Sequence, residues 1–161
     1  MRYVRRVLLP GETVIHYSQL HWVIFTRAIL AALVCLAFVA AALYEAGSQT
    51  QYLSLALWIA AAIFALFALA AGLRAFVRRA STEFAVTDQR IIYKTGLLGR
   101  HTLEMNRTKV ESVDVDQSIL GRLLDYGTII VRGTGGSLEP IRQVAAPLMF
   151  RGYITAAEQP R

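Results

Sequence analysis

The sequence contains few charged residues and a single cysteine. Only 17% of its 161 residues are charged, whereas 55% are hydrophobic, and a soluble domain of this size carries roughly a quarter of its residues as charges. Because Cys35 has no second cysteine to join, an intrachain disulfide framework and a multi-cysteine metal site are both excluded. We therefore exclude intrinsic disorder, a disulfide-stapled secreted scaffold and a zinc ribbon, and expect one domain with at most a small addition.

The missing charges leave two long apolar stretches. No charged residue occurs from Ala28 to Tyr44 or from Tyr52 to Leu73. As a helix rising about 1.5 Å per residue, the second stretch spans roughly 33 Å, and the first reaches a similar length once Trp22–Phe25 are added. Each meets the need of about 20 apolar residues for crossing a bilayer. We therefore predict two transmembrane helices at about residues 22–44 and 52–73.

Two other interpretations of these stretches are weaker. Two buried helices of a soluble protein would need more covering chain than the remaining residues supply. A cleaved signal peptide is disfavoured because 27 residues, several of them charged, precede the first stretch, too many for the basic start of a signal peptide. We therefore interpret residues 22–79 as a membrane anchor of two helices.

Basic residues flank this anchor but are missing from its connection. The loop from Glu45 to Gln51 contains no Lys or Arg, and basic residues gather on the cytoplasmic side of membrane spans. We therefore predict that both termini lie in the cytoplasm. The expected contacts with anionic lipid headgroups are Arg5, Arg6, Trp22, Arg27, Arg74, Arg78 and Arg79.

The distribution of charge also argues against a nucleic acid partner. Residues 1–79 hold 7 basic and 2 acidic side chains, whereas residues 80–161 hold 10 basic and 9 acidic ones. The excess of positive charge thus lies beside the anchor rather than on a separate basic surface. We expect the lipid bilayer, and no nucleic acid, as its partner.

The two spans lack the polar groups that transport through a membrane requires. Their interiors contain no Asp, Glu, His, Lys, Asn, Gln or Pro, so we expect no proton relay and no ion site within one copy. Small residues occur four apart instead, a spacing that lets helices approach closely in lipid. This pattern predicts packing within the hairpin or between copies of a homo-oligomer. The residues concerned are Ala37, Ala41, Ala61, Ala65, Ala68 and Gly72.

After Ala80 the sequence changes to short alternating segments that are typical of strands. The predicted strands are residues 82–87, 90–95, 100–105, 109–116, 128–132 and 138–144, with a turn at Gly133–Gly136. A helix is expected from Ser118, with one apolar face and Gly127 at its end, and another from Pro147 to about Ala157. Residues 80–161 therefore form, by prediction, an α+β domain in which a C-terminal helix caps an antiparallel barrel or sandwich.

The residues before the anchor are expected on the same side of the membrane as this domain. We assign residues 1–21 as an N-terminal cytoplasmic segment. Within it, Glu12–Tyr17 is the stretch that could add an edge strand to the sheet.

The most polar motif of the predicted domain is Thr87-Asp88-Gln89-Arg90. We expect Asp88 to accept N–H groups across a turn, and Arg90 to pair with a carboxylate such as Asp88 or Asp125. Arg122, on the short helix, is expected to pair with Asp116 or Asp125, or to face a partner. These roles are structural ones.

No arrangement of residues indicates catalysis, a cofactor or a metal. The histidines have no metal-ligand spacing, the glycines at 133–136 are not followed by the Lys of a phosphate-binding loop, and no serine lies in a nucleophile motif. Glu111, Asp114 and Asp116 are interpreted as a solvated strand face rather than an ion site. We expect no catalytic residues, no cofactor and no small-molecule substrate.

Several motifs resemble those of one protein family. Leu8-Leu9-Pro10-Gly11-Glu12, His21-Trp22, Phe84 to Arg90, Gln117 to Leu124 and Tyr126-Gly127-Thr128 are similar, in order, to bacterial PH-like membrane proteins of the YdbS type. The resemblance covers nearly the whole chain. It implies a pleckstrin-homology-like barrel on a two-helix anchor in the bacterial inner membrane, and it implies no reaction. Its motif residues, interpreted as structural, include Thr87, Asp88, Arg90, Arg122 and Gly127.

One departure limits the analogy with eukaryotic PH domains. Those that bind phosphoinositides carry a cluster of Lys and Arg at the first hairpin, whereas this chain offers only Arg90 and Lys94 beside Asp88. We therefore do not expect phosphoinositide recognition.

Three functions remain to be compared. The first is a non-enzymatic inner-membrane protein whose PH-like domain docks another membrane protein or assembles with itself. The alternative is a small oligomeric pore or transporter component built from the hairpins, which rests only on the alanine-rich faces. A lipid-modifying enzyme is the third, and it lacks a polar cluster at the membrane interface beyond Arg and His.

Overall fold

The computed structural model describes residues 3–45, 51–96, 99, 101–134, 136–137 and 140–156. The chain divides into two compact units. Residues 24–77 form a helical hairpin, and residues 1–23 together with 78–161 form a β-rich domain. The domain is thus assembled from both sides of the hairpin in the sequence, and each unit is described by itself.

Two long helices make up the hairpin. A short 3-10 helix, η1 (Trp22–Phe25), leads into α2 (Thr26–Glu45), and α3 covers Gln51–Ser81. Alanine and leucine dominate both helices, and neither contains a proline to interrupt the backbone hydrogen bonds. The helix α3 continues eight residues past Leu73, because the arginines that follow the apolar run also favour helix. The apolar run therefore marks a stretch within α3, not its end.

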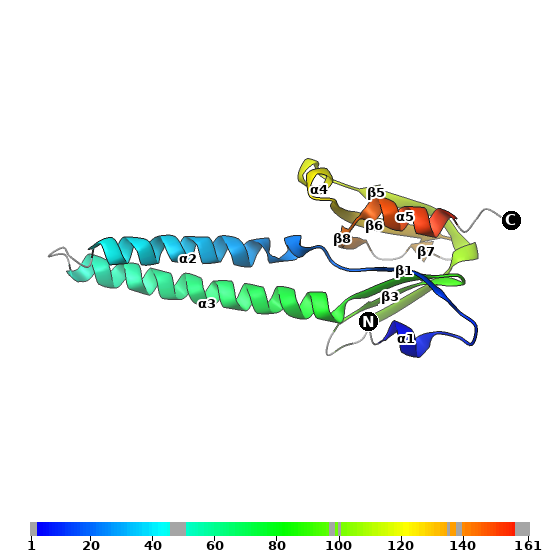
Figure 1. The fold of residues 1–161 in the computed structure, drawn as a ribbon, viewed down its shortest axis with the longest axis horizontal. Helices are drawn as coiled ribbons and strands as arrows, with labels where there is room; N and C mark the ends of the chain where they lie inside the picture. Colours follow the sequence, from blue (N-terminus) through cyan, green and yellow to red (C-terminus); the bar gives the residue numbers. More distant parts are fainter. Residues whose placement is uncertain are drawn as a thin grey trace. The chain divides into compact units, whose positions relative to one another are not determined.

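The helices α2 and α3 run antiparallel and side by side (Figure 1). The rings of Phe38 and Phe64 stack with centroids 5.5 Å apart. The Cys35 thiol donates to the carbonyl oxygen of Ala61 at 3.3 Å. A Cβ built on Gly72 would lie only 3.7 Å from the Cβ of Ala28, so small residues set the helix separation there.

Large apolar side chains of the hairpin point outward. The buried residues of the pair are alanines, whereas Leu36 and Leu66 are 62% and 69% exposed. This distribution is the reverse of the one found in soluble domains, where leucines are buried preferentially.

The described residues of the domain form two antiparallel sheets of four strands each. In the first sheet, the order is β1 (Val14–Ser18), β2 (Glu83–Thr87), β3 (Arg90–Thr95) and β4 (His101–Asn106). In the second, β6 (Tyr126–Gly133) pairs with β5 (Val110–Asp116), β7 (Gly136–Ser137) and β8 (Ile141–Ala145). The remaining elements are α1 (Val4–Val7), the 3-10 helix η2 (Arg107–Lys109), α4 (Ile119–Leu123) and α5 (Pro147–Thr155).

The two sheets are joined at both sides. On one side, η2 carries the chain directly from β4 into β5. On the other, the segment after β1 reaches the second sheet, where Leu20 forms a bridge with Val144 and Gln19 accepts a hydrogen bond from the N–H of Ala145 at 3.2 Å. The result is a bent, barrel-like sheet with little open edge.

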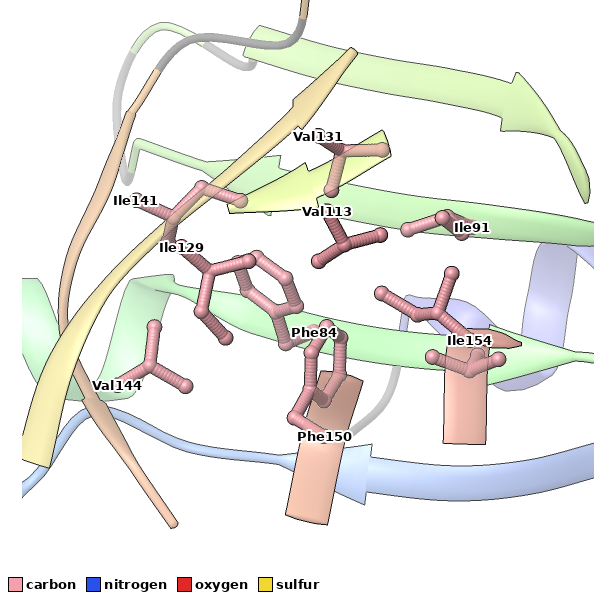
Figure 2. Packing of buried hydrophobic residues seen from close by; sticks show 10 residues of the cluster. Phe84, Ile91, Val113, Ile129, Val131, Ile141, Val144, Phe150 and Ile154 are labelled. Carbon is pink, nitrogen blue, oxygen red and sulfur yellow. The ribbon is translucent and has the colours of Figure 1, made fainter. Parts of the chain in front are cut away.

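The main core fills the space between the sheets (Figure 2). The strands β2, β3, β5, β6 and β8 each contribute a fully or nearly buried side chain to it, and α5 adds Phe150 and Ile154. The ring of Phe150 meets that of Phe84 edge to face, with centroids 5.1 Å apart. Pro147 occupies the first turn of α5, where its missing N–H costs nothing. The predicted capping of the barrel by a C-terminal helix is confirmed.

A second, smaller core lies on the other face of the first sheet. Val4 of α1 packs there with Ala85 and Ile92, and all three are fully buried. The first sheet is therefore covered on both faces. The N-terminal segment, predicted as a separate stretch with a possible edge strand, contributes both α1 and the edge strand β1 to the domain.

Some predicted elements differ from the structure. Gly127 lies inside β6 and does not end α4, which stops at Leu123, because the left-handed backbone at Asp125 already turns the chain. The turn predicted at Gly133–Gly136 includes part of β7, a strand too short to show an alternating pattern. The predicted strand at 138–144 begins only at Ile141 in the described residues, and Ala157 lies outside them.

Candidate functional site

A buried ion pair ties the N-terminal segment to the first sheet. The Glu12 side chain is fully buried, and Arg90 donates to it from Nε at 3.0 Å and from Nη2 at 2.9 Å. The same guanidinium donates to the carbonyl oxygen of Val7 at 2.7 Å and to Glu104 at 2.6 Å. Two parallel bonds between a guanidinium and a carboxylate give both strength and a fixed geometry.

The Glu12 carboxylate is strongly stabilised in its charged form. Burial by itself raises the pKa of a carboxyl group. Hydrogen bonds from Arg90, the N–H of Leu9 and the hydroxyl of Thr87 outweigh this effect and lower the pKa of Glu12 to about 2. The same contacts with Glu12 raise the pKa of Arg90. Glu12 is therefore ionised throughout the physiological range and is not an acid–base group.

Thr87 links this ion pair to the β2–β3 turn. Its hydroxyl donates to Glu12 at 2.7 Å and accepts from the N–H of Arg90 at 2.9 Å and of Gln89 at 3.2 Å. The side chain of Asp88 instead accepts from the N–H of Thr13 at 3.0 Å. Thr87 thus has the turn-capping role that was predicted for Asp88, because its position directly before the turn brings Oγ1 to both amides.

Arg90 pairs with carboxylates as predicted, but the carboxylates that were named as examples for Arg90 and Arg122 are not their partners among the described residues. Arg90 pairs with Glu12 and Glu104 rather than with Asp88 or Asp125, because antiparallel pairing of β3 with β4 and the return of the N-terminal segment bring those carboxylates closer. Arg122 is exposed and has no ion pair with Asp116 or Asp125 in the part of the chain that the structure describes. Its guanidinium therefore remains on the surface.

Arg107 connects the same turn to α5. It is buried, and it donates to the carbonyl oxygen of Thr87 at 3.0 Å and to those of Tyr153 and Ile154 at 2.7 and 3.0 Å. A cation at a helix C-terminus satisfies carbonyl groups that lack partners within the helix and opposes the negative end of its dipole. Arg107 thus holds α5 in the barrel.

Glu83 makes a third contact of this kind, and this contact was also not predicted from the sequence. Its carboxylate accepts from the N–H of Tyr3 at 3.1 Å and of Val4 at 3.2 Å. Burial raises the pKa of Glu83, but these bonds outweigh it and lower the pKa. Glu12 lies in a motif that the family resemblance uses, which is a signal that could have found it. Glu83 and Arg107 are single charges among strand residues, and nothing local distinguishes them.

The polar residues around the β2–β3 turn thus have structural roles. Their hydrogen bonds are directed at backbone groups and at each other. Among the described residues no group of His, Cys, Asp and Glu could hold a metal ion. Asp114, one of the three acidic residues predicted to face solvent, forms an exposed ion pair with Arg132 at 3.1 Å.

A different set of side chains lies at the opposite end of β2. There the chain leaves the domain before the hairpin and returns to it afterwards. The N–H of His21 donates to the carbonyl oxygen of Gln143 at 2.7 Å, and the Gln143 side chain accepts from Arg78 at 3.4 Å. The His21 ring stacks on Tyr126 and lies against Trp22, both at 5.4 Å between centroids. We call the residues His21, Trp22, Arg78, Tyr126 and Gln143 the exit rim.

Burial lowers the pKa of His21. The hydrogen bond of its side chain with the backbone of Leu124 and the charge of Asp125 act in the opposite direction, and Arg79 adds to the lowering. His21 is therefore a neutral packing residue near pH 7 that joins the exit rim to the end of α4. His16 is similar, because it stacks on Tyr153 at 4.3 Å and burial lowers its pKa.

The short helix α4 beside the exit rim exposes its apolar residues. Ile119 and Leu123 are 89% and 79% exposed, and Leu120 and Leu124 are exposed as well. The side chain of Ser118 caps the helix by accepting from the N–H of Gly121 at 3.0 Å, as predicted. The predicted apolar face of this helix therefore faces solvent.

The other predicted surface residues lie at three places. Arg5 and Arg6 are exposed on α1, so they are carried by the domain rather than by the segment that leads into α2. Trp22, Arg78 and Arg79 are exposed at the ends of the helices, and Arg27 and Arg74 are exposed within the hairpin. Their contact with lipid stays a prediction.

The predicted helix-packing residues divide into two groups. Ala61 is buried against α2, and Ala41, Ala68 and Gly72 are half-buried. Ala37 and Ala65 are exposed and are not used within the hairpin. The small residues therefore serve packing within one copy at some positions and leave others open.

The family comparison covers most of the chain. The family model described as "Bacterial PH domain" matches residues 25–157. This match includes the helical hairpin and the strands from β2 onward. No curated protein and no solved structure matches the chain.

Proposed function

The chain belongs to the bacterial PH domain family, and we propose that it is a non-enzymatic protein of the bacterial inner membrane. The hairpin crosses the bilayer twice, and the domain stands on the cytoplasmic side as a module that docks another membrane protein or a second copy. The observation that carries this proposal is the exposure of the two apolar helices.

Both helices are long and apolar enough to cross a membrane. A core helix of a soluble protein would satisfy the same criteria, but it would be mostly buried. In this chain only 11% and 6% of the most apolar stretches of α2 and α3 are buried inside the protein. Leaving such surface in water costs about 25 cal/mol for each Å², and a lipid environment removes that cost.

The pairing of β1 with β2 supports the predicted topology. Val14 pairs with Thr87 and Ser18 pairs with Phe84, so the strands before and after the hairpin belong to one sheet. The two ends of the hairpin must therefore lie on the same side of any membrane that it crosses. Basic residues at those ends favour the cytoplasmic side.

A docking role is favoured over chemistry because of how the polar groups are used. The buried charges of Glu12, Arg90, Arg107 and Glu83 hold α1, β1 and α5 in place through hydrogen bonds within the domain. A rigid domain held close to a membrane is suited to binding a partner there.

Membrane insertion and topology can be tested on the whole chain. We expect the protein to stay in the membrane pellet after extraction with alkaline carbonate. In a Cys35→Ala background, Gln51→Cys should react with a membrane-impermeant maleimide added outside spheroplasts, whereas Ser112→Cys on β5 should react only after lysis. Release by carbonate, or labelling of Ser112→Cys from outside, would contradict the proposal.

Assembly can be tested in the native membrane. We expect a nanodisc prepared directly from membranes to contain either several copies or a stoichiometric second membrane protein, measured by mass photometry and intact-mass spectrometry. Single copies without a second protein at every expression level would refute the docking role. Ion conductance in planar bilayers would favour the pore instead.

A further inference from the structure

We propose that α4 is a third membrane contact, an apolar foot that dips into the cytoplasmic surface of the bilayer. The foot consists of Ile119, Leu120, Leu123 and Leu124. This inference rests on the proposed membrane anchor, and it adds a lipid-binding site to the domain itself. The occupant of the site is a bilayer surface with anionic headgroups.

The first argument is that α4 buries its glycine and exposes its large apolar side chains. Its one buried residue is Gly121, and a Cβ at this position would lie 2.7 Å from the carbonyl oxygen of Tyr126. Only glycine permits this approach, so the helix is pressed against β6 by its smallest residue. The large apolar side chains on either side of Gly121 are consequently directed away from the protein, with Ile119 89% exposed.

The second argument is the position of α4 in the domain. Leu124 directly follows α4, and its backbone hydrogen-bonds to the side chain of His21, the residue before Trp22. Tyr126, two residues later, stacks on the same histidine. The foot therefore lies beside the exit rim, where the chain passes into the helices that are proposed to cross the bilayer.

The third argument is depth. From Leu73, the last residue of the apolar run, to Arg78 of the exit rim there are five residues of continuous helix. At about 1.5 Å per residue this is about 7.5 Å, comparable with the polar layer of one leaflet, which is roughly 5–8 Å thick. The exit rim thus lies at the headgroup level, and an interfacial helix inserts its apolar face about 5–10 Å into that boundary.

The charges around the foot fit the same surface. Arg122 is exposed on α4 itself, and Arg78 and Arg79 are exposed at the end of α3. Basic side chains beside an inserted apolar face can reach anionic headgroups while the leucines enter the acyl boundary. This arrangement also gives exposed Arg122 a function that the predicted ion pairs did not supply.

The start of α5 extends the apolar surface at this end. Leu148 and Met149 are 59% and 57% exposed. The N–H of Ala146, which precedes α5, donates to the carbonyl oxygen of Asp125 at 3.0 Å, so the first turn of α5 is tied to the loop after α4. Leu148 and Met149 thus extend the exposed apolar surface of the foot.

The foot can be located by a fluorescent probe on the full-length chain. In the Cys35→Ala background, Leu123→Cys is labelled with an NBD maleimide and reconstituted into vesicles of phosphatidylethanolamine and phosphatidylglycerol. We expect a blue-shifted emission and strong quenching by lipids that carry a nitroxide near the headgroup. An unshifted emission without quenching would overturn the proposal.

Ser112→Cys provides the matched control. Ser112 is exposed on β5 and pairs with Arg132, six residues along β6 from Tyr126. At about 3.3 Å per residue this distance is roughly 20 Å. The probe at this position should remain unquenched by the same lipids, and equal quenching at both positions would contradict a specific foot.

A second variant tests the apolar residues of the foot that carry no label. Leu120→Glu combined with Ile119→Glu should abolish quenching of a probe at Leu123→Cys, while the protein stays in the carbonate-resistant pellet because the two long helices are unchanged. Release of the protein by carbonate would refute the proposed membrane anchor. Retention in the pellet with no quenching at Leu123→Cys in the unaltered helix would refute the foot alone.

A second copy of the chain is the competing occupant. If the foot binds another copy, the emission shift should depend on the amount of protein per vesicle and persist without nitroxide quenching. That outcome would overturn the lipid assignment. Loss of the shift in vesicles of phosphatidylcholine alone would instead identify the anionic headgroup as the required lipid component.

Discussion

The hairpin and the domain of this protein distribute the same apolar residue types in opposite ways. In the domain, isoleucine, valine and phenylalanine fill the space between two sheets, and charged groups lie outside or are paired. In the hairpin, alanines are buried between the helices and leucines face outward. The hairpin thus has the distribution expected for helices in lipid, where leucine gains nothing from leaving the lipid for the protein interior.

The helix α4 belongs to the domain, but its buried and exposed residues are distributed as in the hairpin. Its glycine faces the protein and its leucines face outward. The domain therefore obeys the rule of a soluble protein except at the end where it joins the hairpin. Each prediction below tests one side of this contrast.

The largest effect is expected in the domain core. Phe150→Ala removes a ring that is fully buried against Phe84, and such a cavity costs about 3–5 kcal/mol in the free energy of unfolding. The measurement is denaturant unfolding in detergent, followed by near-ultraviolet circular dichroism. Met149→Ala, one residue away and exposed, should change the midpoint little. Equal losses in the two variants would contradict the assigned core.

The next largest effect is expected for a residue on the exposed surface of the hairpin. Leu66→Arg changes a side chain that is 69% exposed, which in water would cost almost nothing. At the centre of a transmembrane helix an arginine costs about 2.5–3.5 kcal/mol, so the carbonate-resistant fraction should fall markedly. Ile15→Arg, at an exposed position of β1, should leave that fraction unchanged. An unaffected Leu66→Arg variant would show that this surface faces water.

A smaller effect concerns the buried ion pair and its dependence on pH. The folded pKa of Glu12, about 2, lies below the ordinary value of 4.5. The unfolded chain therefore binds more protons between these values, so the stabilisation is complete above about pH 5 and is lost as the pH falls towards 2. Because glutamine keeps one acceptor oxygen for the guanidinium, Glu12→Gln should lose about 2 kcal/mol of stability at pH 7, the contribution of hydrogen bonds to a charged group, and should show a flatter pH profile over that window.

The control for this prediction is a surface pair. Asp114→Asn removes the ion pair with Arg132, whose side chains are 51% and 60% exposed. Exposed pairs contribute about 0–1 kcal/mol. A pH profile that Asp114→Asn flattens as much as Glu12→Gln does would contradict the assignment of the titration to Glu12.

The smallest effect is expected for a phenylalanine of the hairpin, which can be compared with Phe150 of the domain. Phe38→Ala removes the stack with Phe64 in the hairpin. Aromatic pairs contribute about 0.5–1.5 kcal/mol, and within lipid there is no further gain from removing the ring from water. The cost of Phe38→Ala, measured by steric trapping of the hairpin in bicelles, should therefore be well below that of Phe150→Ala. A cost as large as in the domain core would remove the distinction between the two solvents.

Much of the architecture is predictable because it depends on long or strongly patterned segments. The two charge-free stretches locate the helices α2 and α3, and alternation locates most strands. The capping role of Ser118 and the proline that starts α5 are local signals that the structure confirms. Pairing of β1 with β2 agrees with the edge strand expected near Glu12–Tyr17.

What escaped prediction depends on contacts between distant segments. Arg90 pairs with Glu12, 78 residues earlier in the chain, and Arg107 binds carbonyl groups of α5, 46 and 47 residues later. The outward direction of the α4 leucines follows from the close approach of Gly121 to Tyr126. An apolar spacing reveals that a helix has a face, but it does not reveal which way that face points.

The order of the strands has a consequence for biosynthesis. β1 leaves the ribosome before the hairpin and β2 leaves it afterwards, yet the two are neighbours in one sheet. If only one helix of a nascent chain had threaded into a membrane, β1 and β2 would lie on opposite sides of it. In the proposed topology, only a chain with both helices threaded can close its first sheet.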